Sequence, residues 1–191
     1  MLGISSKLKD CVTITDGKVQ IKDSGKVKGL IDELIYEAVF NADEGQKNAL
    51  QRLVIEIAKK VGAAPSSIQS LYEEMGKNYP GFTVPAINIR GLTYDVSRVI
   101  FRKAIEKNVG AFIFEIARSE IGYTKQRPIE YTAVVLAAAV KEGFRGPVFI
   151  QGDHFQLVRK NYLSDPKPET DYIKGLIKEA IESDFYNIDI D

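Results

Sequence analysis

The sequence contains very little histidine or cysteine and no tryptophan. Among its 191 residues there is one histidine, His154, and one cysteine, Cys11. A single cysteine excludes a disulfide within the chain, and together with the lack of a long apolar stretch near the N-terminus it predicts a cytoplasmic protein. Cys11 begins a segment of alternating apolar residues, so we expect a small core residue rather than a reactive thiol.

The chain also lacks an excess of charge of either sign, because 26 basic residues balance 26 acidic ones. Proteins that bind nucleic acid usually carry a basic patch, so we expect no nucleic-acid partner. No apolar run approaches the roughly 20 residues of a membrane-spanning helix, so we expect no membrane partner. With 45% apolar and 27% charged residues, the composition is that of an ordinary globular protein.

Residues 1–79 have the pattern of a hairpin followed by helices. Asp16–Gly17 separates two short alternating segments, which is a strong signal for a hairpin turn. Apolar residues then recur every three or four positions over 27–40 and 50–61, which predicts two helices. Pro65 suits the first turn of a third helix. We therefore expect an N-terminal extension made of a hairpin and a helical layer.

From residue 80 to 191, apolar segments alternate with amphipathic ones. The expected strands cover residues 82–89, 110–116, 148–151 and 186–191. The expected helices cover 93–107, with Thr93 as the N-cap, 128–143 and 169–183. This order predicts an α/β fold with parallel strands joined by right-handed crossovers. Both an open doubly wound sheet and half of a TIM barrel fit the pattern. The absence of the glycine-rich loops of nucleotide-binding sheets favours the half-barrel of about four strands.

Each predicted strand ends in polar or ionisable side chains, and in a barrel these ends face one opening. The residues concerned are Asn88 and Arg90, then Glu115, Arg118 and Glu120, then Asp153 and His154, and finally Asp189 and Asp191. Clustered carboxylates repel one another, so either some stay protonated or a cation neutralises them. A guanidinium at the opening suits phosphate or carboxylate. The candidate substrate-binding residues are Asn88, Arg90, Glu115, Arg118 and Asp189.

Simpler interpretations exist for several of these residues. Asp153 could cap the turn after its strand, and His154 could be a partly buried imidazole with satisfied hydrogen bonds. The two arginines could be surface residues. We expect the helix acids to be solvated, namely Glu106, Glu142 and Glu179.

Three stretches of the chain, Val84–Arg90, Gly110–Glu115 and Pro147–His154, resemble the class II, metal-dependent fructose-bisphosphate and tagatose-bisphosphate aldolase family. The resemblance covers about residues 80–191. It implies an eight-stranded barrel that cleaves a ketose (bis)phosphate reversibly to dihydroxyacetone phosphate and an aldehyde, with zinc or another divalent cation. It also implies specific roles: Asp153 is the acid/base that transfers the proton, His154 is a zinc ligand, and Asp191 lies where a second cation can bind.

The sequence departs from the family in its histidines, in the Asp-His segment and at the end of the second strand, where Glu115–Glu120 replaces the usual serine or glutamine. Family enzymes use two further histidine ligands from the second half of the barrel, whereas this chain has one histidine. Gly152–Phe155 reads Gly-Asp-His-Phe, which is similar to the non-catalytic companion subunits of tagatose-bisphosphate aldolases. We therefore expect the N-terminal half of a barrel, inactive alone, that associates with a second copy or a complementary half-barrel chain. A non-catalytic subunit and a sugar epimerase on the same fold are the alternatives.

Overall fold

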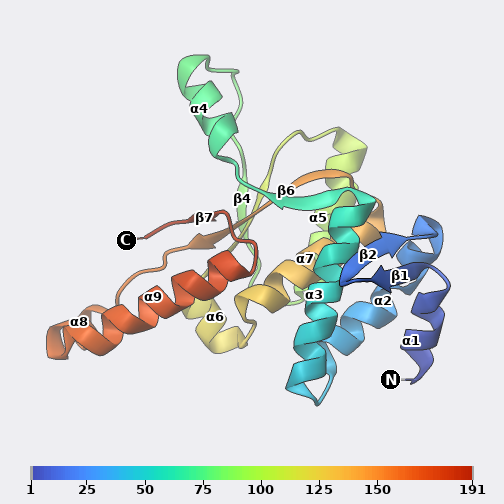
Figure 1. Ribbon diagram of the computed structural model, residues 1–191. Helices are drawn as coiled ribbons and strands as arrows, with labels where there is room; N and C mark the ends of the chain where they lie inside the picture. The colour runs from blue at the N-terminus through green and yellow to red at the C-terminus, as the bar shows by residue number, and fades with distance from the viewer. Residues whose placement is uncertain (1, 191) are drawn as a thin grey trace. The chain divides into compact units, whose positions relative to one another are not determined.

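Figure 1 shows the computed structural model of the protein, which describes residues 2–190 and the side chains of residues 6–190. The chain forms two compact units. The first contains residues 1–64, 92–110 and 130–148, and the second contains residues 65–91, 111–129 and 149–191. The sequence predicts a boundary between an N-terminal extension, residues 1–79, and a half-barrel, residues 80–191. Each unit contains residues from both of these segments, and this boundary stays a prediction.

The first unit contains the hairpin and most of the helices that the sequence predicts. Its elements are α1 (Leu2–Lys9), β1 (Val12–Thr15), β2 (Lys18–Ile21), α2 (Ser24–Phe40), α3 (Glu44–Val61), α5 (Thr93–Lys107) and most of α7 (Pro128–Glu142). The hairpin is confirmed, because β1 and β2 pair antiparallel around Asp16 and Gly17, whose φ angles of 51° and 72° suit a tight turn. Cys11 is fully buried, as expected of a core residue.

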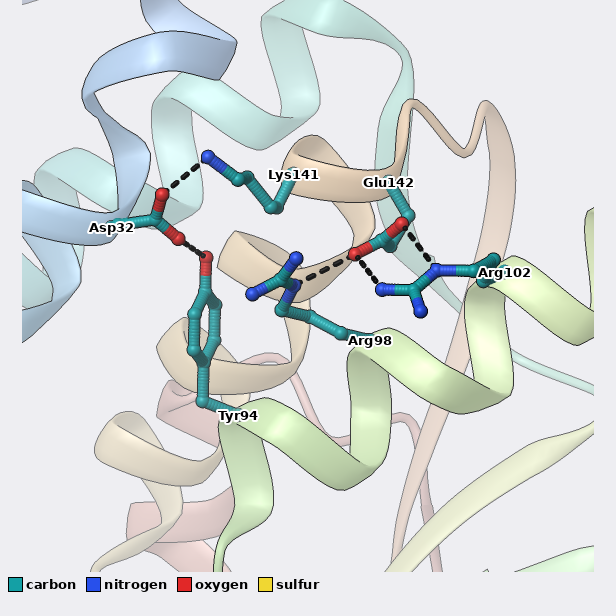
Figure 2. Close-up of polar contacts among 6 residues, drawn as sticks. All are labelled: Asp32, Tyr94, Arg98, Arg102, Lys141 and Glu142. Carbon is teal, nitrogen blue, oxygen red and sulfur yellow. Dashed lines mark hydrogen bonds and ion pairs between the residues drawn. The ribbon is translucent and has the colours of Figure 1, made fainter.

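A polar cluster within the first unit is built around Asp32 of α2 (Figure 2). The hydroxyl of Tyr94 donates to Asp32 Oδ1 at 2.7 Å, and Lys141 forms an ion pair with the same carboxylate. The pKa of Asp32 is lowered because these two partners outweigh the effect of burial. One carboxylate therefore joins α2 to α5 and α7.

Glu142 is the second acid of this cluster, and the expectation that it is solvated was wrong. Its side chain is only 12% exposed, because it accepts hydrogen bonds from Arg98 at 2.7 Å and from Arg102 at 3.0 and 3.1 Å. Arg98 and Arg102 lie four residues apart, on one face of α5. The two bonds from Arg102, together with the one from Arg98, lower the pKa of Glu142 to about 2.

We expect Glu142→Gln to lower the free energy of unfolding by roughly 1–3 kcal/mol at pH 7, because two charge-assisted contacts are lost. The folded-state pKa is below the ordinary value, so the wild-type advantage is present above about pH 4.5 and disappears as the pH falls towards 2. Urea unfolding at several pH values measures this difference. Glu106→Gln is the control, because Glu106 forms an exposed ion pair with Lys103, which is expected to contribute little. Equal effects of the two substitutions would contradict the role of Glu142.

The second unit contains the parallel sheet, with strands β3 and β6 beginning in residues of the first unit. The strands are β3 (Ala63–Ser66), β4 (Ala86–Asn88), β5 (Ile113–Ala117), β6 (Gly146–Asp153) and β7 (Asn187–Ile188). The helices of the unit are α4 (Gln69–Lys77), α6 (Arg118–Thr124), α8 (Arg159–Ser164) and α9 (Pro166–Glu182). β4 pairs with β5, β5 with β6, and β6 with β7, each time in parallel. The α/β class and the parallel sheet are thus confirmed, while closure into a barrel stays a prediction.

The third helix that the sequence predicts is present as α4, but its expected start at Pro65 was wrong, because Pro65 belongs to strand β3. Gly62 ends α3 with a φ of 100°, after which residues 63–66 run extended beside β6, and Gly146 N donates to Gly62 O at 2.8 Å. The fixed φ of proline is as compatible with an edge strand as with a first helical turn. α4 begins only at Gln69.

Several other boundaries also differ from the expected ones, among them the starts of β4 and α5 and the extent of β7, which covers only Asn187–Ile188. The strand expected over 82–89 is shorter, because β4 begins after Pro85, whose carbonyl accepts from Ile113 N at 2.9 Å. Thr93 is the first residue of α5 rather than its N-cap. The cap is Leu92, in the left-handed region with a φ of 50°. None of the helices within residues 2–190 is both long and apolar enough to cross a membrane.

Candidate functional site

The parallel register places four polar residues in one row across the second unit. Asn88 of β4 pairs with Glu115 of β5, Glu115 with Gln151 of β6, and Gln151 with Asn187 of β7. Because side chains alternate along a strand, paired positions in a parallel sheet share a face. Asp153 lies two residues beyond Gln151, so it belongs to the same face.

Glu115 is the one acid among the four residues of this row, and it is buried. It is only 7% exposed, and it accepts a hydrogen bond from the Gln151 side-chain amide. Burial raises the pKa of Glu115, and the charges of Asp153 and Asp189 raise it further. The bond from Gln151 and the proximity of His154 act in the opposite direction. Glu115 is therefore an acid whose ionised form is destabilised by its surroundings.

Asn88 connects two other carboxylates. Its side-chain amide donates to Asp153 Oδ2 at 2.7 Å and to Glu120 Oε2 at 3.2 Å. Glu120, in the first turn of α6, also accepts from Ala117 N at 2.8 Å and forms an ion pair with Arg90. Although burial opposes ionisation, these donors lower the pKa of Glu120. Glu120 and Glu115 are both buried, yet their pKa values are shifted in opposite directions.

His154 follows β6 directly and has an unusual backbone conformation. Its φ is 46°, in the left-handed region that only a few per cent of non-glycine residues adopt. The turn is held because Phe155 N donates to Asp189 O and Asp189 N donates to Gly152 O, both at 2.9 Å. Strained backbone of this kind is common at functional sites.

The imidazole of His154 lies between two carboxylates. Nδ1 is 3.6 Å from Asp189 Oδ2, and Nε2 is 3.7 Å from Asp153 Oδ1. One possible ligand atom from each of the three residues lies within 4.8 Å of the others. One imidazole nitrogen and two carboxylate oxygens are a donor set that zinc and other divalent cations accept. Asp191, the metal ligand expected from the sequence, lies outside the described residues.

Arg118 has protein partners that the sequence did not suggest. It forms an ion pair with Glu169, donates to Gln156 O at 2.6 Å, and places its guanidinium 4.6 Å from the centre of the Tyr172 ring. Glu169 also accepts from Val158 N at 2.6 Å. The Arg118 side chain is 13% exposed and attaches the segment after β6 to α9. A substrate contact for Arg118 stays a prediction.

The other predicted site residues converge within the second unit. Asn88, Glu115, Asp153, His154 and Asp189 lie together at the ends of neighbouring strands, and Arg90 reaches them through Glu120. Sequence reasoning missed Gln151 and the linking role of Glu120. Gln151 could have been found from the sequence, because it lies two residues before Asp153 on the same strand and side chains at that spacing share a face. Comparison with known proteins found no matching family model, no matching curated protein and no matching solved structure.

Gly152 packs closely against the ring of Phe155, next to the turn at His154. A Cβ built on Gly152 would lie 2.7 and 2.8 Å from two carbons of the buried Phe155 ring. We expect Gly152→Ala to lower the free energy of unfolding by about 1–3 kcal/mol, because overpacking displaces this ring. Thermal or urea unfolding measures the change.

Gly175→Ala is the matched control, since Gly175 is exposed on α9 and nothing lies within 4 Å of a Cβ built there. Alanine favours helix over glycine, so we expect this control to be neutral or stabilising. If Gly152→Ala were as stable as this control, the close packing of Phe155 on Gly152 would be wrong.

Proposed function

We propose that this protein is a class II aldolase-like half-barrel. The parent reaction is the reversible cleavage of a ketose (bis)phosphate to dihydroxyacetone phosphate and an aldehyde. The observation that supports the proposal is the convergence of Asp153, His154 and Asp189 at the ends of adjacent parallel strands. Metal-assisted proton-transfer chemistry needs an acid/base beside cation ligands at such a place.

Asp153 is the proposed acid/base. It accepts the proton of the C4 hydroxyl while the C3–C4 bond breaks, and it returns the proton in the direction of synthesis. The hydrogen bond from Asn88 to Oδ2 orients the carboxylate, and Oδ1 lies on the side of His154. Glu115 belongs to the same cluster, where burial and the charge of Asp153 raise the pKa of Glu115.

His154 and Asp189 are the residues that would hold zinc or another divalent cation. When bound, such a cation polarises the ketose carbonyl and stabilises the enediolate as a Lewis acid. Catalytic zinc usually has three protein ligands, so the proposal requires further donors from a second copy or a complementary half-barrel chain. The proposed partners are a sugar phosphate and another protein chain. We propose that the protein acts in the cytoplasm and binds neither nucleic acid nor a membrane.

A non-catalytic subunit is the second candidate, and Arg118 is the observation that favours it. Its guanidinium would suit a substrate phosphate, yet it is occupied by Glu169, Gln156 and Tyr172. In this alternative, Asp153, His154 and Asp189 at the strand ends bind a cation or a sugar phosphate, and no reaction is catalysed.

The first test is titration with Co²⁺, followed by visible absorption. We expect His154→Asn to weaken binding by at least roughly tenfold, because a ligand is lost while asparagine tolerates the left-handed backbone. Asp189→Asn should have a similar effect. Glu182→Gln is the control, since this exposed acid of α9 pairs with Lys178 outside the cluster. Equal affinities of the His154→Asn variant and the wild type would contradict the cation site.

The second measurement separates the two candidate functions. Cleavage of fructose and tagatose bisphosphates is assayed with the cation present. The enzyme hypothesis predicts that Asp153→Asn lowers the rate by roughly 10²–10⁴-fold while Co²⁺ affinity is largely kept. Because the half-barrel is expected to be inactive alone, the assay also contains the complementary half of the barrel. A wild-type rate that is then no higher than that of the cation alone contradicts the enzyme and supports the non-catalytic subunit.

A further inference from the structure

The first unit contains a cavity of about 250 Å³ that none of the strand-end residues line. Its polar lining comes from the first turn of α2, with Ser24 and Gly25, and from two cationic side chains, Lys28 and Arg145. The lining contains no carboxylate. Lys28 and Arg145 thus face one cavity without an acidic residue in its wall.

Within the described part of the chain, these two cations have no acidic partner, whereas several basic residues of the same unit do. Lys141, Arg98 and Arg102 of the same unit each pair with an acid. By contrast, the side chains of Lys28 and Arg145 form no ion pair or hydrogen bond with residues 6–190. Two like charges that converge without an intervening acid create a positive potential, which attracts an anion.

Each of the two cations lies close to a glycine at the end of a helix. Lys28 Nζ lies 3.3 Å from where a Cβ on Gly143 would be, and Arg145 Cγ lies 3.6 Å from the corresponding point on Gly62. Both glycines have positive φ, 81° and 100°, and each follows the last residue of a helix. Cations are favoured near helix C-termini. The side chains of Lys28 and Arg145 donate to no carbonyl within residues 6–190. Their N–H groups are therefore available to a ligand.

The start of α2 adds polar groups to the same cavity. The first N–H groups of a helix have no partner inside the helix and favour an anion. Asp23 caps α2 by accepting from Lys26 N at 3.0 Å, and Asp23 is not part of the cavity lining. The hydroxyl of Ser24 is a further donor at this end.

The remaining wall of the cavity is apolar and is formed by Val61, Val140 and Phe144. We propose that the cavity binds a small phosphate monoester, with the phosphate between Lys28 and Arg145 and the organic part against this apolar wall. The volume is slightly below the roughly 300–1,000 Å³ of sites for drug-sized ligands, which suits a small ester. The proposal does not depend on the aldolase reaction, because it uses none of the strand-end residues.

The test follows backbone amide shifts in ¹⁵N NMR spectra while inorganic phosphate or phenyl phosphate is added at constant ionic strength. We expect saturable shifts at Gly25, Gly143 and Arg145, with tighter binding of phenyl phosphate. Lys28→Gln and Arg145→Gln should each raise the Kd about tenfold, because a charge-assisted hydrogen bond is lost. Both residues are exposed, so the variants should unfold at the wild-type temperature.

Lys26→Gln is the matched control, since it removes one positive charge from the same helix outside the cavity. It should change the Kd less than twofold. Shifts that do not saturate, or an effect of Lys26→Gln equal to that of Lys28→Gln, would show diffuse charge attraction and overturn the proposal. Phenyl phosphate binding no tighter than inorganic phosphate would contradict the role of the apolar wall.

Discussion

Strand β6 is hydrogen-bonded to β5 along one edge and to β7 and β3 along the other. This pairing decides which side chains of the second unit can meet. Its register aligns Glu115, Gln151 and Asn187, and the neighbouring pair of strands adds Asn88. A slip of one residue would turn Gln151 and Asp153 to the opposite face of the sheet. The site therefore depends on backbone hydrogen bonds before it depends on any polar side chain.

The two buried acids of this site are accommodated in different ways. Glu120 receives donors from a backbone N–H, from Asn88 and from Arg90, and the pKa of Glu120 is lowered. Glu115 receives a donor from Gln151 while it faces Asp153 and Asp189, and the pKa of Glu115 is raised. Opposite shifts in neighbouring carboxylates are characteristic of sites that separate an ionised group from a protonatable one. The strained backbone of His154 lies next to these groups and supports the same interpretation.

Much of the second unit could be predicted from the sequence, because its strands are short apolar runs that end in polar residues. That pattern predicted the parallel sheet and the meeting of Asn88, Glu115, Asp153, His154 and Asp189. The role of Glu120 could not be predicted, because α6 begins directly after β5 and returns this acid to the strand ends. The structure around Pro65 was predicted wrongly because the fixed φ of proline is compatible with both the first turn of a helix and an edge strand. The burial of Glu142 could not be predicted because its partners, Arg102 and Arg98, lie on another helix, 40 and 44 residues away in sequence.

The central claim is that acidic residues from separate parallel strands converge on one another, and the pKa of Glu115 reports that convergence directly. It can be measured by NMR titration of the ¹³C-labelled side-chain carboxyl group. The account predicts a pKa above the ordinary value of 4.5, and a lower one in Asp189→Asn, because a neighbouring negative charge is removed. A Glu115 that titrates at or below its ordinary value, unchanged by Asp189→Asn, would contradict the account.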